Sequence, residues 1–228
     1  MVGFLIEFRL HGYAKGYARE LIYAVARRFR VRGMTRSRAV PHVTLYGPSE
    51  TADIKRVISE VEKVGQKYTL VPFQVKGFGY TPSDKNKKVV YLDITPSSEL
   101  KELRWELARR LSKISTHQRW DAKGKFLFHS TIAFKDIDRK FNEIWTFIKA
   151  REKPNIDQYL LRITIIGAHR KILYEYDLAL KRLLNRREAL SKTWWRKTIN
   201  KLRELQGLPP EKQQSALIRF TRFIKRFG

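Results

Sequence analysis

Two short segments of the chain share the pattern His-x-Thr followed by an apolar residue. The first contains His42 and Thr44, and the second contains His129 and Thr131. An imidazole titrates near pH ~6.5, so it can accept or donate a proton close to neutral pH. Cleavage of a phosphodiester requires one group to activate the nucleophile and another to protonate the leaving oxygen. The two motifs therefore predict acid–base chemistry at phosphorus, with the threonine hydroxyls as donors to the non-bridging oxygens.

Both motifs lie in segments that read as short strands, residues 40–46 and residues 126–134. Residues i and i+2 of a strand point to the same face, so each histidine shares a face with the threonine of its own motif. One such match arises easily by chance, but a second copy in similar surroundings indicates a function. The scheme needs neither a metal nor a cofactor, and we expect none.

The elements around the motifs mix strands and helices. Residues 4–10, 73–80, 89–95, 158–168 and 171–180 are apolar and rich in β-branched or aromatic side chains, which predicts strands, the last two as a closing hairpin. Apolar side chains recur at helical spacing in four segments, which predicts four helices. One spans residues 14–30, one is capped by Ser49 or Thr51, one starts at residues 96–99, and one is capped by Asp136 or Asp138. This order predicts an α+β fold with mainly antiparallel sheets.

From Lys181 onward the pattern becomes helical only. Residues 181–206 and 211–227 predict two helices separated by a Gly-Leu-Pro-Pro break, which together form a helical hairpin. We therefore expect a main domain over residues 1–180 and a basic helical extension over residues 181–228. The pair Trp194 and Trp195 has two interpretations: packing of the extension against the main domain, or stacking on nucleic-acid bases.

Composition narrows the class of protein. The chain has 228 residues, a formal net charge of +26, 43% hydrophobic residues and no cysteine. The apolar content is enough for a core, and the missing cysteine excludes disulfide scaffolds, thiolate nucleophiles and zinc–thiolate sites. No apolar run approaches the ~18 residues that a membrane span needs, and acidic and basic residues interrupt the N-terminal apolar stretch early. We expect a cytoplasmic protein without a membrane partner, and a monomer is favoured.

A sequence pI of about 10.4 favours a polyanionic partner, of which nucleic acid is the commonest. Six arginines and no acid lie between Arg27 and Arg38, directly upstream of the first motif. This run is either a solvated loop or a collector of RNA phosphates near the site, so Arg36 and Arg38 are candidates for substrate binding.

The two motifs, their spacing and the order of the flanking elements resemble the two-histidine (2H) phosphoesterase superfamily. The branch with the greatest similarity is the LigT-like RNA 2′,3′-cyclic phosphodiesterases, also called the 2′-5′ RNA ligase family. The resemblance covers about residues 1–180. It implies a bilobed fold with pseudo-twofold symmetry and two antiparallel sheets. It also implies that His42 and His129 are the acid–base pair, and that Thr44 and Thr131 bind the phosphate.

The implied reaction opens a terminal ribose 2′,3′-cyclic phosphate of RNA with water and leaves a 2′-phosphate. Two alternatives remain open: a 2′-5′ ligase acting on tRNA halves, and a non-catalytic RNA-binding module. Where the bacterial branch has an arginine five residues after the second motif histidine, this chain has Phe134, and Lys135 follows. Lys135 is a further candidate for substrate contact. Tyr46 has two interpretations, stacking on a substrate base or packing in the core.

Overall fold

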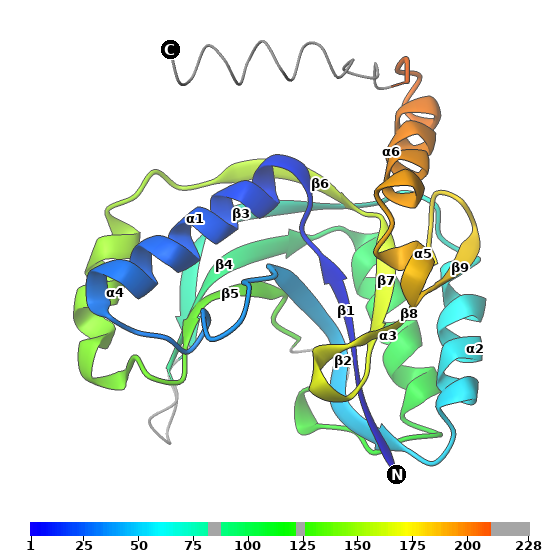
Figure 1. Ribbon diagram of the computed structural model, residues 1–228, viewed down its shortest axis with the longest axis horizontal. Helices are drawn as coiled ribbons and strands as arrows, with labels where there is room; N and C mark the ends of the chain where they lie inside the picture. The colour runs from blue at the N-terminus through cyan, green and yellow to red at the C-terminus, as the bar shows by residue number, and fades with distance from the viewer. Residues whose placement is uncertain (82–87, 122–125, 211–228) are drawn as a thin grey trace.

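The computed structural model describes residues 1–81, 88–121 and 126–210, which form two antiparallel sheets flanked by helices (Figure 1). The five-stranded sheet has the order β2-β1-β7-β8-β9, and the four-stranded sheet has the order β5-β4-β3-β6. The strands are β1 Val2–Arg9, β2 His42–Thr51, β3 Val71–Thr81, β4 Val89–Pro96, β5 His129–Phe134, β6 Asn155–Leu160, β7 Arg162–Ile166, β8 Ile172–Asp177 and β9 Arg182–Asn185. The α-helices are α1 Gly12–Phe29, α2 Ile54–Gly65, α3 Ser98–Leu111, α4 Phe141–Lys149, α5 Arg186–Ala189 and α6 Lys192–Leu205. This architecture confirms the expected α+β class with two antiparallel sheets.

The expected closing hairpin is only partly correct. Its two strands were expected over residues 158–168 and 171–180, but residues 155–160 form β6, which pairs with β3 in the four-stranded sheet. The hairpin of the five-stranded sheet consists of β7 and β8 alone. Among the described residues, no helix has the length and apolar character that crossing a membrane requires.

Capping groups explain where some helices begin. Helix α3 begins within residues 96–99, as expected, and Ser97 caps it by accepting a backbone hydrogen bond at 3.2 Å. The expected cap of α2 at Ser49 or Thr51 is wrong, because β2 continues to Thr51. Asp53 takes that role, and its carboxylate accepts two backbone N–H groups of the first turn at 2.9 and 3.1 Å.

The expected cap at Asp136 or Asp138 is also wrong, because α4 begins at Phe141 without a side-chain cap. Asp136 instead accepts the backbone N–H groups of Arg32, at 2.6 Å, and of Gly33, at 3.0 Å. This carboxylate therefore connects the end of β5 to the segment that follows α1.

Helices α2 and α3 cover one face of the five-stranded sheet, with α2 against β7 and β8 and α3 against β2. Tyr176 of β8 is fully buried against Gly65 of α2, where a Cβ atom would fall 2.2 Å from the tyrosine ring. Because side chains alternate along a strand, Glu175 and Asp177 point to the opposite face. The same face carries Thr44, Glu7 and Thr164, which lie opposite one another and opposite Glu175 on neighbouring strands. One face of this sheet is therefore apolar under the helices, and the other carries polar and charged side chains.

The segment after Lys181 begins differently from the expected helix. Residues Arg182–Asn185 form β9, which pairs with β8 and adds a fifth strand to the sheet. The prediction of a purely helical extension from residue 181 is therefore wrong at its start. The long helix of the extension, α6, begins at Lys192, and the second expected helix, residues 211–227, lies outside the described residues.

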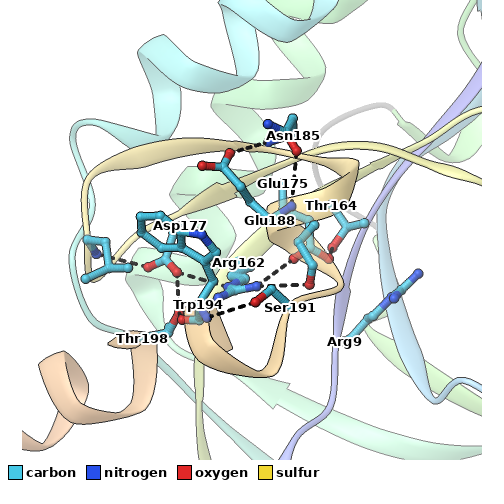
Figure 2. Close-up of polar contacts among 12 residues, drawn as sticks. Arg9, Arg162, Thr164, Glu175, Asp177, Asn185, Glu188, Ser191, Trp194 and Thr198 are labelled. Atoms are coloured by element: carbon cyan, nitrogen blue, oxygen red, sulfur yellow. Dashed lines mark hydrogen bonds and ion pairs between the residues drawn. The ribbon is translucent and has the colours of Figure 1, made fainter. Parts of the chain in front are cut away.

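A buried network of charged groups attaches α6 to the polar face of the sheet (Figure 2). Arg162 of β7 donates to Asp177 at 2.9 Å, to Glu175 at 3.1 Å and to Thr198 of α6 at 2.5 Å. The Thr198 hydroxyl in turn donates to Asp177, and Thr164 donates to Glu175 at 3.1 Å. All five side chains belong to buried residues, so α6 is held by groups that water does not reach.

Both tryptophans of α6 take part in this packing. The ring centroid of Trp195 lies 5.0 Å from the guanidinium carbon of Arg162 and 5.9 Å from the ring centroid of His11. The cations of Arg182 and Lys197 each lie 4.2 Å from the ring centroid of Trp194. These contacts favour the packing interpretation of the tryptophan pair over base stacking.

Candidate active site

Each motif histidine is the first residue of an edge strand, His42 of β2 and His129 of β5. These two strands belong to different sheets and contact each other. Their rings make the same local hydrogen bond. Nδ1 of His42 lies 2.8 Å from the carbonyl oxygen of Val40, and Nδ1 of His129 lies 3.0 Å from that of Leu127. A carbonyl oxygen only accepts, so each Nδ1 carries the hydrogen and each Nε2 is left to exchange a proton.

The backbone irregularity next to each motif is also repeated. The pairing of β2 with β1 skips Leu45, directly after Thr44, and the pairing of β5 with β4 skips Ile132, directly after Thr131. One extra residue in a strand forms a bulge, and bulges recur beside active sites because they re-aim neighbouring side chains. The two halves thus share the motif, the ring hydrogen bond and the bulge, which agrees with the expected pseudo-twofold relation.

The surroundings of His129 favour its neutral form. Burial lowers the pKa of this histidine below its ordinary value of 6.5, and the nearby charge of His42 lowers it further, whereas the Leu127 carbonyl and Asp93 raise it. The ring centroid of Tyr91 lies 5.1 Å from that of His129. The strands that begin with the two histidines, β2 and β5, contact each other.

His42 has a carboxylate beside its free nitrogen. Oε2 of Glu7 lies 3.7 Å from Nε2 of His42, and Oε1 of Glu7 accepts a hydrogen bond from Arg9 at 3.2 Å. The Glu7 side chain is 7% exposed and that of His42 is 32% exposed. The two groups form an ion pair whenever His42 carries its second proton. Glu7 was not predicted from the sequence, where its only signal is an acid inside an otherwise apolar strand.

Of the two interpretations of Tyr46, the structure shows packing in the core, and base stacking is wrong. The bulge at Leu45 reverses the alternation of β2, so Tyr46 points away from the face that carries Thr44. The tyrosine is fully buried, and its hydroxyl bonds to the Ser115 hydroxyl and the Thr116 carbonyl, both at 3.0 Å.

The remaining substrate candidates are all exposed. Arg36 and Arg38 lie on the segment between α1 and β2. Lys135 directly follows β5 with a left-handed backbone, φ 79°, and its ammonium lies 5.9 Å from the ring centroid of Phe134. Phe134 is opposite Val89, two residues from Tyr91 on β4, so it shares the face of His129 and Thr131. Substrate contact by these three cations stays a prediction. Within residues 1–81, 88–121 and 126–210, no three His, Asp or Glu side chains are grouped to hold a metal ion.

Comparisons with known proteins place this geometry in a family. The model of the 2′-5′ RNA ligase superfamily matches residues 19–170, which include both motif strands. The solved structure of E. coli LigT with 3′-AMP is similar at 12% identity and a TM-score of 0.45, over 73% of this chain and 87% of that one. Kluyveromyces marxianus Usb1 with uridine monophosphate is similar at 12% identity and a TM-score of 0.43, over 74% of this chain and 94% of that one.

A solved phosphoesterase is similar at 14% identity and a TM-score of 0.43, over 81% of this chain and 93% of that one. No curated protein matches the chain. The assignment therefore depends on the family model, whose match covers most of the chain and ends before β8, β9 and α6. This chain belongs to the 2′-5′ RNA ligase superfamily of 2H phosphoesterases, as its paired His-x-Thr motifs led us to expect.

Proposed function

We propose that this protein hydrolyses the terminal 2′,3′-cyclic phosphate of RNA to a 2′-phosphate. The observation that carries the proposal is the matched pair of histidines on β2 and β5. Each has Nδ1 tied to a carbonyl two residues earlier, which leaves both Nε2 atoms to serve one phosphorus centre. Membership of a superfamily of RNA phosphoesterases and ligases supports an RNA substrate.

The different surroundings of the two rings suggest different roles. His129, whose lowered pKa keeps it neutral, takes a proton from water on Nε2 as the water oxygen bonds to phosphorus. His42, beside the Glu7 carboxylate, donates the Nε2 proton to the 3′-oxygen as the bond between phosphorus and that oxygen breaks. The product is a 2′-phosphate with a free 3′-hydroxyl, and exchange with solvent returns each ring to its starting form.

The threonines complete the site by binding the phosphate. The hydroxyls of Thr44 and Thr131 donate to the non-bridging oxygens, whose negative charge increases in the transition state. Each threonine shares a strand face with the histidine of its motif, so the two hydroxyls approach the phosphate from the same sides as the two rings.

Ligation is a second candidate, favoured by the family to which the chain belongs. The 5′-hydroxyl of a second RNA end would replace water as the nucleophile, and His129 would take its proton. The same bond to the 3′-oxygen would break, which gives a 2′-5′ linkage. Hydrolysis and ligation thus use the same four side chains and differ only in the nucleophile admitted.

The experiment compares His42→Ala and His129→Ala with the wild type on an oligonucleotide that ends in a 2′,3′-cyclic phosphate. Each variant should lose about 10²- to 10⁴-fold in rate, the usual contribution of a general acid or base. His117→Ala, which removes an exposed histidine elsewhere, is the matched control and should keep the wild-type rate. Wild-type rates in both motif variants would refute the proposal.

Ligation is tested with the same proteins and split tRNA. Joined products that resist a nuclease specific for 3′-5′ linkages, and that disappear with His42→Ala, would establish the ligase. Release of a 2′-phosphate without any joined product would assign hydrolysis alone.

A further inference from the structure

We propose that the body of the substrate RNA binds a basic hollow at the end of α1, away from the histidine pair. We call it the arginine hollow; it is lined by Tyr23, Arg27, Arg30, Arg32 and Thr35, among others, and measures about 630 Å³. The inference rests on the proposed function, which identifies the partner as RNA. It adds the path that the RNA strand takes beyond its terminal phosphate.

The three arginines of the hollow are exposed and, within the described part of the chain, have no acidic partners. Among the described residues, no carboxylate forms an ion pair with Arg27, Arg30 or Arg32, although eleven ion pairs occur elsewhere. Arg27 lies in the last turn of α1, where the helix dipole favours a cation. Arg30 is the C-cap residue of α1, so the dipole favours this cation as well, whereas Arg32 lies beyond the helix end. Gathered cations repel one another, and a bound polyanion relieves that repulsion.

The segment that carries these arginines is held in place at both ends. Near its start, the Asp136 carboxylate accepts the backbone N–H groups of Arg32 and Gly33, which leaves the Arg32 guanidinium to bind other groups. Near its end, the backbone N–H of Ala39 donates to the Tyr23 hydroxyl at 3.4 Å. Val31 and Ala39 are buried. A segment fixed in this way presents its cations with little further ordering of the backbone on binding.

The position of the hollow connects it to the histidine pair. Figure 1 shows the segment between α1 and β2 passing β5 on its way to the start of β2, where His42 lies. Asp136, which anchors the segment, follows β5, and β5 begins at His129. At ~3.3 Å per residue the strand from His129 to Phe134 is about 17 Å long. One RNA strand several nucleotides long therefore reaches from the histidines, which hold its terminal phosphate, to the hollow, which holds other phosphates.

An RNA strand fits these features better than a membrane or an acidic protein segment. The surface is hollowed rather than flat, and its cations are guanidinium groups, whose planar donors match phosphate oxygens in pairs. The exposed Arg36 and Arg38 lie on the same segment between the hollow and His42, so cations follow the whole route.

The test measures the binding of a ten-nucleotide single-stranded RNA that ends in a 3′-phosphate, as a function of salt. The triple variant Arg27→Gln, Arg30→Gln, Arg32→Gln should bind at least about tenfold more weakly at low salt. Its slope of log affinity against log salt should be smaller by about 2, since each phosphate that the variant no longer neutralises reduces the slope by about 0.7. The matched control replaces Lys55, Arg56 and Arg109, exposed cations on α2 and α3, by Gln and should keep the wild-type affinity and slope.

Equal affinities and slopes for the triple variant and the control would overturn the inference. So would a triple variant that loses binding to vesicles rich in anionic lipid but keeps its RNA binding. Thermal unfolding of every variant shows whether a weaker affinity reflects misfolding, and single substitutions at the same positions then replace the triple variant. The proposed function is tested separately, since a wild type that binds RNA through the hollow but cleaves no cyclic end would refute only the reaction.

Discussion

Replacing Arg162 by Met removes the cation at the centre of the network that attaches α6 to the sheet. Glu175 and Asp177 then remain without the guanidinium that pairs with them at 3.1 and 2.9 Å, and their side chains are only 5% and 0% exposed. Removal of one partner from a buried ion pair costs about 3 to 5 kcal/mol. A chain of this size loses about 2 to 4 °C in Tm per kcal/mol, so we expect Arg162→Met to lower the Tm by roughly 6 to 20 °C.

The control is Arg182→Met, on the strand next to Asp177. Arg182 also pairs with an acid, Glu188 at 2.5 Å, but its side chain is 49% exposed. Exposed pairs contribute about 0 to 1 kcal/mol, and a cation–π contact such as that of Arg182 with Trp194 contributes about 0.5 to 1 kcal/mol, so this variant should lose clearly less stability than Arg162→Met. Thermal and urea unfolding measure both variants. Equal decreases in stability for Arg162→Met and Arg182→Met would refute the conclusion that the buried network holds α6.

Three further predictions concern the site and the RNA path. Thr44→Val and Thr131→Val should each slow hydrolysis of a 2′,3′-cyclic phosphate end by about 10²- to 10³-fold in single-turnover kinetics, because each removes one donor to the phosphate. The Tm should be unchanged. A decrease in rate of less than about threefold would contradict that role. The lowered pKa of His129 keeps its ring neutral at pH 7, so the fall of kcat/KM on the acid side of the profile should begin only below pH 6.5, and NMR titration should show that His42→Gln raises this pKa. Asp136→Ala should weaken binding of the ten-nucleotide RNA several-fold, because it frees the segment that carries the arginine hollow. The same variant should turn over a dinucleotide that ends in a 2′,3′-cyclic phosphate at the normal rate. An equal decrease on both substrates would contradict the anchoring role of Asp136.

The sequence allowed the two motif strands to be predicted because the His-x-Thr pattern repeats locally. His42 and Thr44 are two residues apart, as are His129 and Thr131, and the alternation of a strand is enough to put each pair on one face. The helix cap at Ser97 is likewise a local signal, since a cap needs only the first turn that follows it.

The features that the sequence did not reveal depend on partners far along the chain. Residues 182–185 contain two leucines among charged and polar residues, a pattern that also fits the start of a helix, and only pairing with β8 makes them a strand. The sequence left the two interpretations of Tyr46 open because a bulge, which no local pattern marks, shifts the alternation by one residue. Glu7 reaches His42 only because β1 pairs with β2 in one register.

The buried network shows the same limit. Arg162, Glu175, Asp177 and Thr198 come from two strands and a helix, and charged residues are seldom buried without partners. Nothing in the sequence near each of them shows that the partners exist. Their shared burial follows only from the fold.

The central claim is that the two motif histidines serve one phosphorus centre. The most direct measurement follows both imidazoles by NMR while a nucleoside 2′-phosphate, the chemical class of the proposed product, is added. We expect the resonances of His42 and His129 to move together and to saturate at the same ligand concentration, since one anion contacts both Nε2 atoms. A response from only one ring, or saturation of the two rings at different concentrations, would contradict the account.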